Sequence, residues 1–209
     1  MVEIRYPPPT RNISPQWFEL KAGTTIQRIF DPTSYGATAM GFRYYGPLSR
    51  FDHQLIKNKP VVSKDRGIIY AGLSLSCCLI EIFGDDDTIK IQQQKIAYIT
   101  LKQSLKLLNL RESGAWDAGS VSAMAVDGRR KLTQAWSCYF YENPDLYQYI
   151  DGLIFSNAHD GQMALALYER AASKLLSADV SVLDLNEPTI RETVLAIATK
   201  LNLLVEIEL

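Results

Sequence analysis

Short apolar runs that carry or adjoin a single polar side chain are the feature of this sequence that most constrains its fold. These residues are Arg28 in TTIQRIF, Arg50 in PLSRFDH, Tyr70 in GIIYAGLS, Glu81 in CCLIEIFGD and Ser156 in DGLIFSNAHDG. Burying one such group without a partner costs roughly 1–3 kcal/mol. Because one buried polar group is ordinary and five are not, we expect these side chains to gather in a polar cleft.

The remaining pattern is a mixture of short strands and helices in no regular order. Strands are predicted at 24–30, 66–72, 150–157, 178–185 and 202–209, with two more inside 89–110. Helices are predicted at 74–83, 129–142 and 161–176, and from Pro188 to Lys200 with Asn186 as its cap. Residues 31–65 are rich in turn formers, which is typical of a functional loop. Mixed content without a βαβ array predicts the α+β class.

Composition excludes several classes of function. A chain of 209 residues with net charge −1 fits one domain and has neither the basic surface of a nucleic-acid binder nor a polybasic membrane patch. The start lacks the apolar region of a signal peptide, and no apolar run reaches the length of a membrane span. Three cysteines and two histidines form no disulfide or metal-ligand pattern. We therefore expect a cytoplasmic protein with reduced thiols and no metal.

Helical periodicity gives Glu81 a distinct position. In a helix over 74–83 the apolar stripe consists of Leu75, Cys78, Leu79 and Ile82. Glu81 lies on a different stripe with Cys77 and Ser74, whose small side chains leave space over the carboxylate. That stripe faces either a pocket or bulk water, and periodicity leaves both interpretations open.

The other polar residues also have two interpretations each. Arg28, Arg43 and Arg50 compete for an anion-binding role, because a guanidinium donates two parallel hydrogen bonds and keeps its charge when desolvated. A surface salt bridge is the alternative for each arginine. Tyr70 is either a pocket wall or a core ring, and Ser156 is either a ligand contact or a turn serine. No base lies at a recognisable spacing from Ser156, so a nucleophilic serine is not supported.

The order of these motifs resembles the RES-domain family, which is named for its characteristic Arg, Glu and Ser. Tyr70-Ala71-Gly72 precedes Glu81 by eleven positions, similar to the family's Tyr-Leu-Ala and later Glu. The segment DGLIFS, which ends at Ser156, resembles the family's Asp-Gly-Ile-X-Tyr/Phe-Ser. Arg28 takes the place of the first-strand arginine.

A second arginine motif departs in one position. Arg50-Phe51-Asp52 resembles the family's Gly-Arg-Phe/Trp-Asp/Asn element, but Ser49 replaces the glycine. Arg43 matches no motif and ranks third among the arginines.

The resemblance implies an ADP-ribosyltransferase-like fold with a split β-sheet core and surrounding helices. Residues 28–175 would form the RES-like catalytic core, with 1–27 as an N-terminal extension packed on it. Residues 176–209 would add a C-terminal helix and strand to the same single domain. It also implies NAD+ as substrate, with Arg28, Glu81 and Tyr70 in catalysis. Arg28, Arg50, Tyr70 and Ser156 would bind NAD+.

The same resemblance implies a toxin that cleaves the nicotinamide–ribose bond of NAD+ by hydrolysis or phosphorolysis. Its partner would be a helix-turn-helix antitoxin that blocks the cleft, in a toxin–antitoxin hetero-oligomer; a homodimer is also open. Two alternatives are an ADP-ribosyltransferase that modifies a protein and a catalytically silent binding module with this fold. The sequence does not identify the acceptor of the ADP-ribosyl group.

Overall fold

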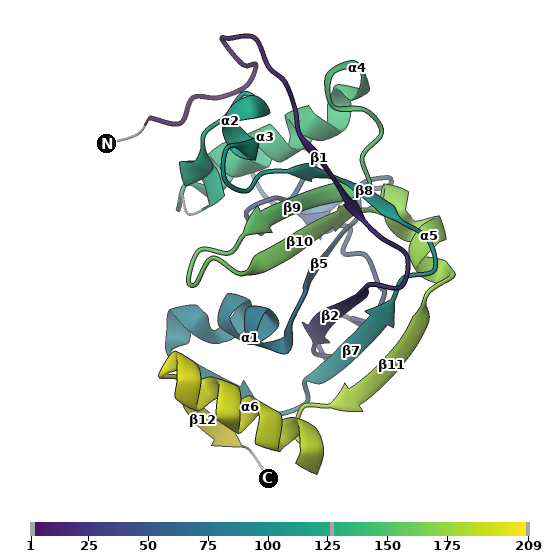
Figure 1. Ribbon diagram of the computed structural model, residues 1–209, viewed down its shortest axis with the longest axis vertical. Helices are drawn as coiled ribbons and strands as arrows, with labels where there is room; N and C mark the ends of the chain where they lie inside the picture. Colours follow the sequence, from purple (N-terminus) through teal and green to yellow (C-terminus); the bar gives the residue numbers. More distant parts are fainter. Residues whose placement is uncertain (1–2, 126–127, 208–209) are drawn as a thin grey trace.

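A curled β-sheet forms the centre of the computed structural model, which describes residues 3–125 and 128–207 (Figure 1). Within these residues the sheet has eight strands, in the spatial order β1 (Trp17–Leu20), β8 (Leu105–Asn109), β9 (Gly152–Ser156), β10 (Met163–Tyr168), β5 (Ile68–Gly72), β2 (Thr25–Phe30), β7 (Lys95–Thr100) and β11 (Asp179–Asp184). Neighbours pair antiparallel except β8 and β9, which are parallel. Two smaller pairs are β6 (Thr88–Ile91) with β12 (Leu204–Ile207) and β3 (Tyr45–Gly46) with β4 (Val61–Val62).

Helices cover the two ends of this sheet. They are α1 (Leu75–Phe83), α2 (Gly114–Asp117), α3 (Arg130–Glu142), α4 (Pro144–Tyr147), α5 (Ala172–Leu176) and α6 (Pro188–Leu201), with short 3-10 turns η1 (Gly84–Asp86), η2 (Ser122–Ala125) and η3 (Glu169–Ala171). In Figure 1, α2, α3 and α4 lie at the end that holds β8 and β9, and α1 and α6 lie at the end that holds β2 and β7. The predicted α+β class, a sheet core with surrounding helices, is confirmed.

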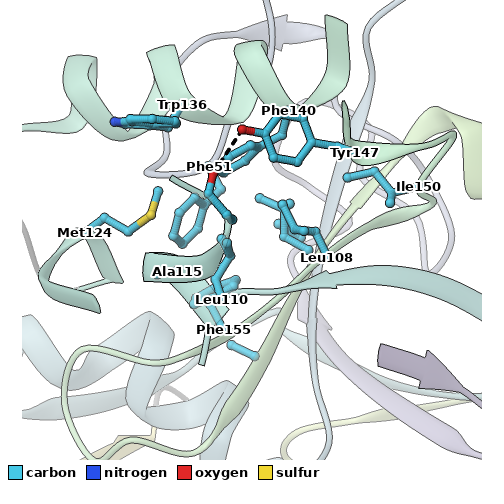
Figure 2. Packing of buried hydrophobic residues seen from close by; sticks show 14 of the residues in the cluster. Phe51, Leu108, Leu110, Ala115, Met124, Trp136, Phe140, Tyr147, Ile150 and Phe155 are labelled. Atoms are coloured by element: carbon cyan, nitrogen blue, oxygen red, sulfur yellow. Dashed lines mark hydrogen bonds between the residues drawn. The ribbon is translucent and has the colours of Figure 1, made fainter. Parts of the chain in front are cut away.

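The core under α3 is built from large aromatic side chains. Trp136 and Phe140 of α3 pack toward Phe51 and Phe155, and all four are buried (Figure 2). The extended N-terminal segment lies on the same end of the molecule, because the Trp136 indole N–H donates to the Arg5 carbonyl at 2.7 Å.

The sheet divides between β2 and β5. β2 pairs with β7 along its whole length, from Thr25 to Phe30, whereas β2 and β5 share one backbone pair, Gln27 with Gly72. Because β2 and β5 are joined at one position only, they diverge beyond it. The sheet therefore has two parts, one formed by β1-β8-β9-β10-β5 and the other by β2-β7-β11. This division is the split expected of the core, and it leaves room between β2 and β5.

Two predicted elements are wrong. Residues 161–176 are not one helix, because Met163–Tyr168 forms β10 and only the following residues are helical. The segment 164–168 is buried on both faces between β9 and β5, so it lacks the alternation that marks a strand. Residues 89–110 hold β7, β8 and most of β6, which is three strands instead of two.

Smaller differences occur at the ends of the chain. Glu187, and not Asn186, caps α6, with its carboxylate accepting from the Ile190 amide at 3.4 Å. β1 was not predicted, and the proposed boundary after residue 27 falls inside β2. In the described residues no helix has the length and apolar character needed to cross a membrane.

Candidate active site

A cavity of about 560 Å³ opens at the division between β2 and β5. Its walls come from β2, β5, residues 77–82 of α1 and the loop before β3, with one residue each from β9 and β10. Arg28 enters it from β2, Tyr70 from β5 and Glu81 from α1. The structure therefore brings together three of the five predicted site residues. Arg43 also lines the cavity, whereas Arg50 and Ser156 do not.

Arg28 is a partly buried cation with no carboxylate partner among the described residues. Its Nη1 donates to the carbonyls of Gly41 at 2.9 Å and Ala39 at 3.3 Å, so it also fixes the loop that forms one cavity wall. Burial, and then the charge of Arg43, lower the pKa of Arg28 to about 10. Positive charge is therefore in excess at this wall, and an anion bound there would offset the free-energy cost of burying the Arg28 charge.

Arg43 and Tyr70 are both held by Asp52, a carboxylate with no solvent exposure. Arg43 Nη2 lies 2.9 Å from each carboxylate oxygen, and the Tyr70 hydroxyl donates to Oδ1 at 2.9 Å. The same hydroxyl accepts from the Phe51 amide at 3.0 Å. Burial, and then the charge of Asp52, raise the pKa of Tyr70 well above its ordinary value. Tyr70 thus offers the cavity its ring, not an ionisable hydroxyl.

Glu81 is an exposed residue of α1 that lines the cavity, with protein enclosing part of its side chain. This enclosure raises its pKa, while the charges of Arg50 and His159 and the backbone amide of Ala158 oppose the rise. Glu81 thus lines the cavity, with its pKa raised and the two nearby cations limiting that rise. Both interpretations of its helical stripe hold in part, because the stripe faces a pocket that is open to solvent.

The buried face of α1 differs from the expected stripe, since Ile80 and Phe83 are also buried. Leu75, Cys78 and Leu79 are buried as predicted, but Ile82 is 47% exposed and lines the cavity, and Cys77 is buried at 1% exposure. The cause is that α1 packs against both the strands and α6, so its buried face is wider than one stripe. Burial raises the pKa of Cys77 to about 11, so this cavity-lining thiol stays protonated.

Arg50 and Ser156 lie near this site without lining it. Arg50 Nη1 donates to the Ala125 carbonyl, and its charge acts on Glu81. Its Nε is buried and has no hydrogen-bond partner within residues 3–125 and 128–207. Ser156 is partly buried at the end of β9, opposite Met163 in β10. Their roles in binding stay predictions.

Sequence reasoning missed two parts of the site. One is Asp52, which was noted only as the end of an arginine motif; its full burial had no sequence signal beyond its neighbour Phe51. The other is an aromatic rim, made of Tyr35, Tyr44 and Tyr45, along the loop at the cavity wall. These side chains are 104%, 37% and 47% exposed. No cluster of metal-ligating side chains occurs in the described residues.

Comparison with known proteins identifies the class to which this fold and cavity belong. A family model described as the RES domain matches residues 25–189. The chain therefore belongs to the RES-domain family. Among solved structures it is similar to a chain in the crystal structure of the M. tuberculosis MbcT-MbcA toxin-antitoxin complex. The TM-score is 0.52 and the identity 12%, over 83% of this chain and 90% of that chain. At that identity the likeness concerns the fold. Among curated proteins no match was found.

Proposed function

We propose that this protein cleaves the nicotinamide–ribose bond of NAD+ and acts as a toxin of its family. The observation that carries the proposal is the convergence of Arg28, Tyr70 and Glu81 on one cavity, from three different elements. Its volume of about 560 Å³ is within the usual range for small-molecule sites. A cation without a carboxylate partner among the described residues, an aromatic wall and a carboxylate are the groups needed to hold a dinucleotide and stabilise charge on its ribose.

Glu81 carries the chemical step in this proposal. Departure of nicotinamide leaves positive charge on the ribose, and an ionised carboxylate beside that carbon stabilises it electrostatically. Nicotinamide leaves as a neutral molecule, so the step needs no general acid. Water or phosphate then adds to the ribose carbon.

Arg28 and Tyr70 bind and orient the substrate. Arg28 has donors left beyond the two loop carbonyls that it holds, and its excess charge suits the pyrophosphate. Tyr70 has its hydroxyl fixed by Asp52, so its ring is a rigid surface on which nicotinamide can stack. We also propose Arg50 and Ser156 as outer contacts, with Arg50 favouring the ionised form of Glu81.

A partner protein completes the proposal. The similar solved structure is of a toxin–antitoxin complex, and the exposed aromatic rim at the cavity mouth is a surface that a protein segment can cover. We propose a helix-turn-helix antitoxin as that partner and the cytoplasm as the location. These points rest on the family and on the exposed mouth, not on a bound partner.

The test is incubation of the purified protein with NAD+, with and without phosphate, read by mass spectrometry for nicotinamide and for the ribosyl product. We expect nicotinamide release by the wild type and at least a hundredfold slower release by Glu81→Gln, the range in which removal of one electrostatic group falls. The carboxylate must be ionised, and its pKa is raised above 4.5, so the rate should fall on the acid side at a pH above 4.5.

The outcomes separate the three functions that the sequence left open. Free ADP-ribose or its phosphate ester supports the proposal. Labelled ADP-ribose on a protein shows transfer to a protein instead. Binding of NAD+ without nicotinamide release, or full activity in a folded Glu81→Gln variant, contradicts the proposed mechanism.

A further inference from the structure

The turn between β9 and β10 is tied together by one buried side chain. Asn157 is 3% exposed. Its side-chain oxygen accepts from the amides of His159, Asp160 and Gly161 at 3.0, 2.9 and 3.2 Å, and its Nδ2 donates to Asp160 at 2.6 Å. The Asn157 amide also donates to the Gln162 carbonyl at 2.8 Å, which closes the turn. Gln162, the last residue before β10, is therefore held in a defined place.

The Gln162 side chain connects this turn to the start of α1. Its Oε1 accepts from the Ser74 hydroxyl at 2.6 Å, and its Nε2 donates to the Ser76 hydroxyl at 3.0 Å and to Asp160 within the turn. Ser74 is at the same time the N-cap of α1, because its hydroxyl accepts from the Cys77 amide at 3.0 Å. One amide side chain thus joins the turn both to the cap and to the helix.

Cys77 extends the same contact toward the cavity. Its thiol donates to the Met163 carbonyl at 3.4 Å and accepts from Asn157 Nδ2 at 3.7 Å. Cys77 precedes Glu81 by about one helical turn, and both residues line the cavity. Because a short helix moves as one element, the place of its first turn determines where Glu81 stands.

Apolar packing holds the opposite side of α1. Leu75, Leu79 and Phe83 belong to the buried cluster formed with β2, β6, β7 and α6. Hydrophobic contacts press the helix onto the sheet but have no preferred direction. Hydrogen bonds do have one, so the contacts from Gln162 are suited to fix the helix along and about its axis. The Cys78 thiol adds a further contact of this kind, to the Gln27 carbonyl at 3.2 Å.

We propose that Gln162 is a positioning residue for Glu81. By holding the first turn of α1, it fixes the helix relative to the sheet, which carries Arg28 and Tyr70. The inference rests on the proposed role of Glu81 in bond cleavage. Arg28 and Tyr70 bind the substrate in that proposal and belong to strands that Gln162 does not hold. A displaced α1 should therefore slow the chemical step and leave substrate binding nearly intact.

The first test is amide hydrogen exchange in the full chain. In Gln162→Ala, exchange in residues 78–83 should become about threefold to tenfold faster, the factor that corresponds to the loss of roughly one hydrogen bond. Exchange in β5 and β10 should stay unchanged, because the Gln162 side chain takes no part in their backbone pairing. Gln103→Ala is the matched control, since it removes a glutamine-to-serine hydrogen bond between β7 and α6, to Ser177 at 3.2 Å. It should leave residues 78–83 unchanged.

Ser76→Ala separates loss of the contact from loss of helix propensity. Alanine is a better helix former than serine, so faster exchange in residues 78–83 of this variant would follow from the lost contact with Gln162. We expect a smaller effect than in Gln162→Ala, because the contact with Ser74 remains. Unchanged exchange in either variant overturns the proposal. An equal rise in β5 and β10 overturns it as well, because it would show a general loss of structure.

Kinetics at equal concentrations of folded protein give a readout that a purely structural role would not move. In Gln162→Ala, kcat for nicotinamide release should fall about tenfold or more, because a small displacement of a reacting group is costly. KM should change by less than about twofold. The double variant Gln162→Ala/Ser74→Ala should lose less than the product of the two single losses, because both residues act through one contact.

The outcomes keep this role apart from the proposed function. An unchanged kcat in Gln162→Ala, with faster exchange in α1, overturns the positioning role. A rise in KM as large as the fall in kcat also overturns it. If the wild type releases no nicotinamide, the proposed function fails, and hydrogen exchange still decides whether Gln162 holds α1.

Discussion

Asp52 shows how one residue can define a site without touching its ligand. It neutralises Arg43, fixes the Tyr70 hydroxyl and accepts from the amides of Leu48 and Ser49. Because Arg43 is neutralised, Arg28 is the cation whose charge the cavity retains. A single buried carboxylate therefore decides which of two neighbouring arginines is available to an anion.

We predict that Asp52→Asn lowers the free energy of unfolding by about 2–4 kcal/mol. Arg43 loses its counter-charge, and a buried asparagine presents one acceptor oxygen where the carboxylate accepts from Tyr70, Leu48 and Ser49 with two. The matched control is Asp179→Asn, which removes an exposed ion pair with Lys102 at 2.6 Å and should cost less than about 0.5 kcal/mol. Urea unfolding of both variants makes the measurement. Equal losses in the two variants would mean that Asp52 is not a structural centre.

At the division between β2 and β5, Arg28 links strand β2 to the loop before β3. Its guanidinium extends from β2 to the carbonyls of Ala39 and Gly41, so one side chain joins a strand to the loop over the cavity. A loop fixed by so few hydrogen bonds opens more readily than the strands beside it.

We expect Arg28→Ala to speed amide hydrogen exchange in residues 36–42 and to raise the KM for NAD+ about tenfold or more, since it loses a charge-assisted contact of roughly 1.5–3 kcal/mol. Arg50→Ala is the control, because Arg50 donates to Ala125 on a different segment. In Arg50→Ala, amide hydrogen exchange should become faster in residues 122–125 and stay unchanged in residues 36–42. Faster exchange at 36–42 in both variants would argue against a specific anchor.

Sequence reasoning succeeded for features that depend on neighbouring residues and failed for features that depend on distant segments. The helix that carries Glu81 was predicted because its apolar periodicity lies within the segment itself. The structure adds a local start, since the Ser74 hydroxyl accepts from the Cys77 amide at 3.0 Å. β10 was assigned to a helix because its strand character comes from β5 and β9, which are distant in sequence.

The residues of the candidate site also differ in whether a local sequence signal marks them. Arg28, Tyr70 and Glu81 were marked by polar groups in apolar runs, a signal within each segment. Asp52 takes its place in the site from contacts across the fold, with Arg43 and Tyr70, so no local pattern identified it. Arg50 was chosen by its motif, and its placement against Ala125 depends on packing that the motif does not contain.

At the scale of the whole molecule, the cavity is open. No segment of the described residues fills it, and its rim exposes three tyrosine rings to solvent. Under the proposed function, a partner that covers the mouth would restrain such a site. The same rings that frame the entrance are suited to bind such a partner, because aromatic side chains are enriched at the centres of protein interfaces.

We therefore predict that expression of this protein without a partner arrests bacterial growth and depletes cellular NAD+. Glu81→Gln, induced to the same soluble level, should permit normal growth, because it keeps the rim and the fold and removes only the carboxylate charge. Growth curves and an enzymatic NAD+ assay on the same cultures make the measurement. Growth arrest that persists in Glu81→Gln with normal NAD+ would point to toxicity through binding. Normal growth and normal NAD+ with soluble wild-type protein would contradict the toxin proposal, because an open and unrestrained site should act on the NAD+ that surrounds it.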